Sequence, residues 1–122
     1  QIRAVNGGDK LLLYSGDDGS TKDFVLRGGD GCISVTANIA PAQMHKMIMA
    51  ALDGDEKLAS ELNAPLEMLH DKLFCEANPM PTKWALNQLG QISTSTARPP
   101  LGALDEQCYG IVEEALRSAK LM

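Results

Sequence analysis

Two short apolar runs near the beginning of the sequence predict buried β-strands. Leu11 to Tyr14 is continuously apolar, and Gly31 to Thr36 is rich in small and β-branched residues. Neither run alternates between apolar and polar side chains, which is typical of strands covered on both faces in a parallel sheet. A helix of about Thr21 to Arg27 separates the runs, and Gln1 to Val5 has the pattern of a helix end. The sequence thus predicts a parallel strand–helix–strand unit.

From Pro41 onward the apolar residues recur at helical spacing. One predicted helix runs from Pro41 to Leu52. A second runs from about Asp55 to Cys75, with a kink expected before Pro65 because proline lacks the backbone N–H. A third helix follows the Asn78-Pro79-Met80-Pro81 turn, and Asp105 is expected to cap a fourth.

These elements do not form a closed sheet. A pair of strands gives each strand one neighbour, whereas strands that are apolar on both faces require neighbours on both edges and cover on both sides. Leaving such side chains exposed would forgo on the order of 1.5–3 kcal/mol for each large residue. We therefore expect this chain to be the carboxyl-terminal part of a larger parallel sheet or barrel.

Composition and charge exclude some classes of partner and location. The chain has 122 residues, enough for one domain of modest size, and a net charge of −5. This charge argues against nucleic acid as a partner, because no basic patch is available to neutralise phosphates. No apolar run approaches the roughly 20 residues of a membrane span, and the first ten residues lack a signal-peptide pattern. A cytoplasmic protein without membrane association is expected.

Cysteine and histidine do not form a recognisable metal or disulfide pattern. Cys32, Cys75 and Cys108 are odd in number and widely spaced, so we expect three reduced thiols. His45 and His70 lie on separate predicted helices without the spacing of metal ligands. Solvent-facing or packed histidines are therefore predicted.

Three motifs carry a resemblance to a known enzyme family. They are YSGDD at Tyr14 to Asp18, GCISVTANIAP at Gly31 to Pro41, and NPMPTKWAL at Asn78 to Leu86. Together with the linking FVLRGGDG, the later ARPPLGALDE and the terminal EEALRSAKLM, they closely resemble the dihydrodipicolinate synthase family of pyruvate-dependent Schiff-base aldolases. The match covers essentially the whole chain, in order and with matching spacing.

The resemblance implies an α/β fold, the (β/α)8 TIM barrel, followed by a small C-terminal helical bundle. Residues 1–52 would form the last strand–helix units of the barrel, and residues 53–122 the helical extension. A complete barrel takes about 250 residues, so an N-terminal half of the barrel would be a separate partner or an absent segment. The Schiff-base lysine and the proton-relaying tyrosine would lie in that half, which leaves no catalytic residue here.

The resemblance also implies the chemistry and the site. Members of the family condense pyruvate with aspartate semialdehyde in lysine and diaminopimelate biosynthesis, typically as homotetramers, and no cofactor or metal is expected. The main chain at Ile33 would face pyruvate, Gly16 and Asp17 would lie beside the second substrate, and Asn78 would lie near the site. Three of these residues also have a structural interpretation: Ile33 as a core strand residue, Asp17 (with the neighbouring Asp18) as a helix cap, and Asn78 as a turn residue.

Two other functions remain open at this point. One is another 2-keto acid aldolase, such as an N-acetylneuraminate lyase, although the ISVTAN and NPMPTKWAL segments favour the synthase. The other is a non-catalytic helical interaction domain. Borohydride trapping with labelled pyruvate would separate an aldolase from an interaction domain, because only the aldolase forms an imine.

Overall fold

Two short parallel strands and a layer of helices make up the first part of the chain. The computed structural model describes residue 4 and residues 10–122, so most of the helix end expected at Gln1 to Val5 lies outside the described residues. Strand β1 is Tyr14–Ser15 and strand β2 is Gly31–Cys32. They pair in parallel, with Tyr14 beside Gly31 and Ser15 beside Cys32. Helix α2, Asp18–Leu26, connects them, which confirms the predicted strand–helix–strand unit.

Both strands are shorter than the apolar runs predicted. Strand β1 begins only at Tyr14, and Leu11 and Leu12 precede it with 57% and 66% of their surfaces exposed. Strand β2 ends at Cys32 rather than at Thr36, which instead begins the 3-10 helix η1 of Thr36–Asn38. A strand continues only where its main-chain groups find a neighbouring strand. Beyond Cys32 the N–H groups of Val35 and Thr36 donate to a side chain of α2 instead.

Helix α2 begins three residues before the predicted start at Thr21. The Asp17 side chain caps it by accepting a hydrogen bond from Ser20 N, and this recruits residues 18–20 into the helix. The helix ends before Gly28, whose φ of 98° is a left-handed conformation that favours glycine. The following Gly29 packs closely, because a Cβ atom there would lie 2.3 Å from the ring of Phe24.

The helices after Pro41 follow the predicted pattern with one correction. Helix α3 spans Pro41–Leu52, as predicted, with Pro41 in its first turn. The long helix predicted from Asp55 to Cys75 is interrupted. It consists of α4, Glu56–Asn63, then the 3-10 helix η2, Ala64–Leu66, and then α5, which ends at Lys72. The interruption includes Pro65, so the proline does disturb the helix as predicted, but by ending it and starting a 3-10 segment rather than by kinking one continuous helix.

The last part of the chain contributes two further helices. Helix α6 spans Met80–Gln88 and follows the cis Asn78–Pro79 peptide bond. The 3-10 helix η3, Glu106–Cys108, leads into α7, Tyr109–Ser118. Asp105 caps η3 by accepting from Gln107 N at 2.8 Å, as the sequence predicted. The rings of Trp84 and Tyr109 stack with centroids 4.9 Å apart and hold α6 against α7.

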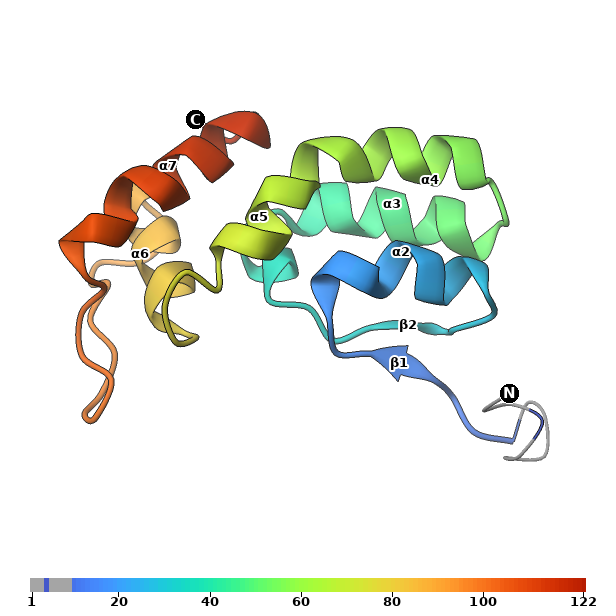
Figure 1. The fold of residues 1–122 in the computed structure, drawn as a ribbon, viewed down its shortest axis with the longest axis horizontal. Coiled ribbons are helices and arrows are strands. Elements are labelled where there is room, and N and C mark those ends of the chain that lie inside the picture. The colour runs from blue at the N-terminus through green and yellow to red at the C-terminus, as the bar shows by residue number, and fades with distance from the viewer. Residues whose placement is uncertain (1–3, 5–9) are drawn as a thin grey trace.

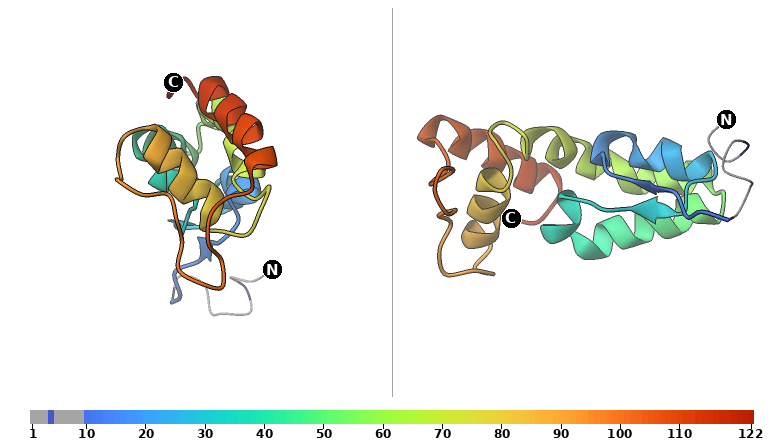
Figure 2. Two further views of the ribbon diagram at one scale, coloured as in Figure 1. Left: turned by 90° about the vertical axis from the view of Figure 1, so that its left-hand side faces the viewer. Right: turned by 90° about the horizontal axis from the view of Figure 1, so that it is seen from below.

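The helices bury their apolar side chains, and the strands do not. Figure 1 shows α2, α3 and α4 side by side, with β1 and β2 against one side of this layer and α6 and α7 at the opposite end of the molecule. Figure 2 shows that, in the described part of the chain, the remaining side of the two strands has no helix or strand next to it. The main core lies among η1, α3, α5, α6 and α7 and includes the fully buried Met47, Leu66, Leu69, Leu73, Val112 and Leu116.

A smaller cluster joins the layer of helices. It consists of Val25 from α2, Ala50 and Ala51 from α3, and Ala59 from α4. The small alanine side chains allow the helix backbones to approach closely. No helix within the described part of the chain has the length and apolar character needed to cross a membrane.

Candidate active site

Three of the four predicted site residues lie at the carboxyl ends of the parallel strands. Gly16 and Asp17 follow β1 directly, and Ile33 follows β2. The two strand ends are joined by the bond from Ile33 N to Ser15 O, at 2.8 Å. Gly16 and Asp17 are exposed, and 75% of the Ile33 surface is exposed. In parallel α/β folds ligands bind at this edge of the sheet, so the fold places these residues where chemistry is expected.

Asn78 lies in a different part of the chain, immediately before α6. Asn78 is exposed, and its Oδ1 accepts a hydrogen bond from Thr82 Oγ1 at 3.2 Å within the same segment. This contact and the cis Asn78–Pro79 bond are typical of a turn that starts a helix. Asn78 is therefore not brought to the strand ends by any contact of its side chain in the described residues.

Asp17 serves as the cap of α2. Its Oδ2 accepts from Ser20 N at 3.0 Å and also from the Ser20 hydroxyl group. These two bonds, the hydroxyl first, hold the pKa of Asp17 below its ordinary value, because they stabilise the ionised carboxylate. The structural interpretation of Asp17 as a helix cap is confirmed, and its exposed position still leaves the residue at the mouth of the site.

The next residue, Asp18, has a role that the sequence analysis did not assign. Its carboxylate is 4% exposed, and Oδ2 accepts from Val35 N at 2.9 Å and from Thr36 N at 3.0 Å. Asp18 thus holds the β2–η1 segment, which we define as residues 33–36, against the beginning of α2. Within the described residues, Asp18 Oδ1 is the one buried side-chain polar atom without a hydrogen-bond partner.

A buried histidine continues this network into the helical part of the chain. His70 of α5 is 6% exposed, with Nδ1 2.9 Å from Thr36 Oγ1 and Nε2 3.1 Å from Asn63 Oδ1. Because an amide oxygen can only accept, Nε2 carries the proton and Nδ1 accepts from the Thr36 hydroxyl. The Asn63 amide in turn donates to Glu67 Oε1 at 3.4 Å. His70 is therefore a packed histidine, as predicted, and His45 is exposed.

Burial determines the protonation of His70. Removal from water lowers the pKa of His70, while the negative charges of Asp18, Glu67 and Asp17 act in the opposite direction and are weaker. The imidazole is thus neutral in the arrangement described above. The neutral ring with its proton on Nε2 accepts the Thr36 hydroxyl proton at Nδ1, whereas a protonated ring would donate from Nδ1 to the hydroxyl oxygen.

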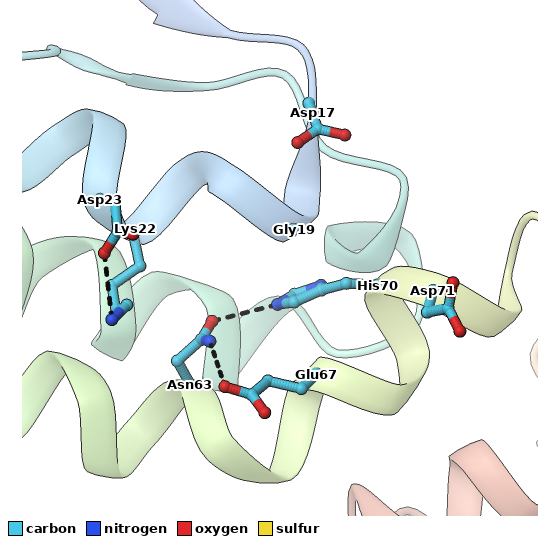
Figure 3. Close-up of a pocket in the computed structure, with 8 residues that line it drawn as sticks. All are labelled: Asp17, Gly19, Lys22, Asp23, Asn63, Glu67, His70 and Asp71. Atoms are coloured by element: carbon cyan, nitrogen blue, oxygen red, sulfur yellow. Dashed lines mark hydrogen bonds and ion pairs between the residues drawn. The ribbon is translucent and has the colours of Figure 1, made fainter.

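These residues border an open cavity of about 400 Å³ between α2 and the α4–α5 region. Figure 3 shows His70 and Asn63 joined on one wall and Asp17 above them at the strand end. The amine of Lys22 lies 3.1 Å from Asp23 Oδ1 and 3.3 Å from Ser60 Oγ. The lining residues are Asp17, Gly19, Lys22, Asp23, Asn63, Glu67, His70 and Asp71.

Among the described residues, Lys22 in the cavity lining and the thiols of Cys32 and Cys75 elsewhere do not have the properties of activated nucleophiles. The Lys22 amine is engaged by Asp23 and Ser60. Burial, and then the Asp18 carboxylate, raise the pKa of the Cys32 thiol, which disfavours its reactive thiolate form. Burial, followed by the neighbouring Cys108 thiol, raises the pKa of Cys75 to about 11.

Metal binding has no support in the described residues, where no group of three or more histidine, cysteine, aspartate or glutamate side chains could hold an ion. The carboxyl ends of the strands instead offer main-chain groups, a carboxylate and the flexible backbone of Gly16. Such an arrangement can bind and orient a small ligand. It cannot by itself form a covalent bond to a carbonyl group, which requires a nucleophile.

Comparison with known proteins gives the chain a family. The model of the Dihydrodipicolinate synthetase family matches residues 2–119. The 4-hydroxy-tetrahydrodipicolinate synthase of Thioalkalivibrio sulfidiphilus is 52% identical over 92% of this chain and 38% of the relative. The enzyme of the same name from Shewanella denitrificans is 51% identical over 99% of this chain and 41% of the relative.

A solved structure matches equally well. The crystal structure of the chloride-inhibited dihydrodipicolinate synthase from Acinetobacter baumannii, complexed with pyruvate, superposes with a TM-score of 0.92 at 45% identity. The match covers 99% of this chain and 40% of that structure. The chain thus spans about 40% of the length of the relatives it matches. From sequence and from structure alike, the chain belongs to the Dihydrodipicolinate synthetase family.

Proposed function

We propose that this chain is part of a 4-hydroxy-tetrahydrodipicolinate synthase, a lyase that condenses pyruvate with aspartate semialdehyde. The observation that carries the proposal is the match of nearly the whole chain, at about half identity, to two enzymes of that name. The juxtaposition of Gly16, Asp17 and Ile33 at the strand ends supports it independently. The same relatives favour the synthase over an N-acetylneuraminate lyase or an interaction domain.

Within the complete enzyme, residues 1–52 form the last strand–helix units of a (β/α)8 barrel and residues 53–122 form the C-terminal helical extension. The uncovered side of β1 and β2 supports this assignment. Leu11, Leu12, Tyr14 and Ile33 are all at least 51% exposed, although strands of this composition are normally covered on both faces. The rest of a barrel would supply the neighbouring strand and the interior side chains that cover them.

The reaction requires a lysine amine from the rest of the barrel. The amine nitrogen bonds to C2 of pyruvate and a water molecule leaves, giving an imine. The protonated imine accepts electrons better than a ketone does, so the methyl carbon loses a proton more easily and an enamine forms. The enamine carbon then attacks the aldehyde carbon of aspartate semialdehyde, whose oxygen takes up a proton and becomes a hydroxyl group. The amino group of the adduct cyclises onto the imine carbon and displaces the lysine amine, which releases the product.

This chain contributes the wall of the pocket to that reaction. The main chain at Ile33 faces pyruvate, Gly16 and Asp17 border the second substrate, and Asn78 lies near the site. Glycine at position 16 suits this role, because the exposed backbone without a Cβ atom admits a ligand closely. The function also implies a cytoplasmic enzyme and a homo-oligomer, typically a tetramer in this family.

Borohydride trapping tests the proposal directly. A barrel chimera is made by replacing the matched 40% of the A. baumannii enzyme with this chain, and both the chimera and the chain alone are incubated with labelled pyruvate and borohydride. Hydride reduces the imine to a stable secondary amine, so we expect one label per chimera and none on the chain alone. A folded chimera without label would contradict the function. Label on the chain alone would contradict the assignment of the lysine to the other part of the barrel.

Substrate preference separates the two aldolase alternatives. With pyruvate saturating, the chimera should consume aspartate semialdehyde and leave N-acetylmannosamine unchanged. The parent A. baumannii enzyme, assayed in parallel, is the matched control. Consumption of N-acetylmannosamine alone would favour the lyase alternative.

A further inference from the structure

The β2–η1 segment is fixed by hydrogen bonds along its main chain. At its beginning, Ile33 N donates to Ser15 O of β1 at 2.8 Å. At its end, Val35 N and Thr36 N both donate to Asp18 Oδ2, at 2.9 and 3.0 Å. These bonds hold the peptide groups on both sides of the exposed Ile33–Ser34 stretch. The segment therefore cannot shift toward or away from the mouth of the site without breaking buried bonds.

The same segment is also held from the helical part of the chain. The Thr36 side chain, which is fully buried, donates to Nδ1 of His70 on α5. Nε2 of His70 is held by Asn63 at the end of α4. The orientation of the imidazole is thus set from one side by Asn63, and the ring in turn sets the position of Thr36. The chain of contacts runs from the helical extension to the strand end, and its members His70 and Asn63 also line the cavity beside Asp17.

Asp18 is a buried carboxylate, a group that is costly to use only for holding the fold together. It is 4% exposed, and one of its carboxylate oxygens has no partner among the described residues. Burying a carboxylate is unfavourable unless its oxygens are satisfied. A helix begins equally well without a buried acid in its first turn, since Asp17 already caps α2. The carboxylate therefore does more than start the helix: it fixes two consecutive peptide groups of the β2–η1 segment.

We propose that Asp18 and the Thr36–His70 pair are positioning residues for pyruvate binding, acting through the main chain of Ile33. This inference rests on the proposed function, in which that main chain faces pyruvate. None of the three side chains touches the substrate. They hold the peptide groups of residues 33–36, which include the main chain of Ile33 that faces pyruvate in the proposed function. Removing one of these side chains should therefore weaken pyruvate binding more than an equally destabilising substitution elsewhere in the chain does.

Thr36→Val in the barrel chimera tests the inference. Valine keeps the branched shape and removes only the hydroxyl that binds His70. The pyruvate concentration that gives half-maximal borohydride trapping should rise about fivefold, the effect of one lost buried hydrogen bond. Thr36→Ser, which keeps the hydroxyl, should restore the unmodified value. The half-saturation for pyruvate in the steady-state reaction should rise by the same factor in the Val variant.

A matched control separates positioning from stability. Val112→Ala truncates a fully buried residue of α7 in the main core, away from the β2–η1 segment. It should lower the melting temperature at least as much as Thr36→Val and leave the half-saturation for pyruvate unchanged. If Thr36→Val lowers the melting temperature but binds pyruvate as the unmodified chimera does, the network is structural only and the inference is wrong.

Asp18→Asn provides a second variant of nearly the same shape. Its single amide oxygen can still accept from the two N–H groups, but without the charge, so we expect about a tenfold rise in half-saturation for pyruvate. This variant decides the question if Thr36→Val does not fold; unchanged pyruvate binding would overturn the inference. If the unmodified chimera is not labelled, the proposed function is wrong and the inference is wrong with it. If the unmodified chimera is labelled and the variants bind pyruvate equally well, only the inference is wrong.

Discussion

The strand-bearing region, residues 10–35, and the helical region, residues 36–122, treat the same kinds of side chain in opposite ways. In the helical region Leu66, Leu69 and Leu73 are fully buried. In the strand-bearing region Leu12 and Ile33 are 66% and 75% exposed. The difference does not come from composition. It comes from whether the secondary structure can be completed within this chain.

A helix satisfies its own backbone, so it needs only one apolar stripe covered. Helices α3, α5, α6 and α7 cover one another in this way. A strand of a parallel sheet needs neighbours on both edges and cover on both faces, and β1 and β2 have one neighbour each and helix α2 on one side. The contrast teaches that the main buried core lies in the helical region, whereas the two strands beside the proposed site keep one side uncovered in the described part of the chain.

The largest expected effect lies in the helical region. Leu69→Ala removes a fully buried side chain of α5 and leaves a cavity in the main core. We expect the free energy of unfolding to fall by about 2–5 kcal/mol, measured by urea denaturation of the chain. Leu58→Ala, at a residue that is 43% exposed, is the control and should change it much less. Equal effects of the two substitutions would break the distinction between the regions.

A substitution in the strand-bearing region should affect stability differently in the chain alone and in the barrel chimera. In the chain alone, Leu12→Ser should change stability by less than about 0.5 kcal/mol, because the side chain is already exposed. In the barrel chimera the same substitution should reduce stability by about 1.5–3 kcal/mol, the value of a buried leucine. Urea denaturation of both proteins measures the difference. An equally small effect in the chimera would show that no barrel segment covers Leu12.

Substitution of the two capping aspartates should have a smaller effect on stability and allows the two regions to be compared. Asp105 caps η3 in the helical region and Asp17 caps α2 beside the strands. Each substitution to alanine should lower the free energy of unfolding by about 1 kcal/mol. Only Asp17→Ala should also raise the concentration of aspartate semialdehyde that half-saturates the chimera, because only Asp17 borders the proposed substrate. Asp105→Ala is thus the matched control. A similar rise for both variants would contradict the assignment of Asp17 to the site.

The smallest effect is a pH dependence that links the regions through His70. Because burial lowers the pKa of His70 below its ordinary 6.5, the unfolded chain binds more protons than the folded chain in the window below pH 6.5. Stability from this group is complete above that value and falls as the pH decreases through the window. Melting temperatures between pH 7.5 and 5.5 should therefore decline, and His70→Gln should flatten the decline.

His45→Gln, at an exposed histidine, is the control for that measurement. It should leave the pH dependence of melting as it is in the unmodified chain. A decline that persists in full in His70→Gln would assign the pH dependence to other groups and not to the contact between α5 and the β2–η1 segment.

Local signals allowed the sequence to predict much of this structure. Pro41 and Leu52 bound α3 as predicted, and Pro65 breaks the following helix because proline lacks a backbone donor. Asp105 caps the last helical segment through its own side chain. In each case the determining contact lies within a few residues along the chain, where residue type and spacing are sufficient.

The candidate site was predicted less completely. The resemblance to the family implied Gly16, Asp17 and Ile33 as site residues, and in the structure they follow two paired strand ends at one edge. Asp18 and His70 were missed as anchors, because their partners in the β2–η1 segment lie 17 or more residues away and no pattern in the sequence links them. The second aspartate of SGDD was the one available signal, since Asp17 alone is enough to cap the helix.

The sequence by itself determined where helices lie, the bounds of α3 and the resemblance to the family, because these depend on local backbone chemistry and on ordered motifs. Only the tertiary structure decided how short the strands are, which side of them stays open, and which buried groups hold the β2–η1 segment. The physical reason is that strands and buried polar side chains are satisfied by distant partners. Their state is fixed only when the chain has folded and those partners are in place.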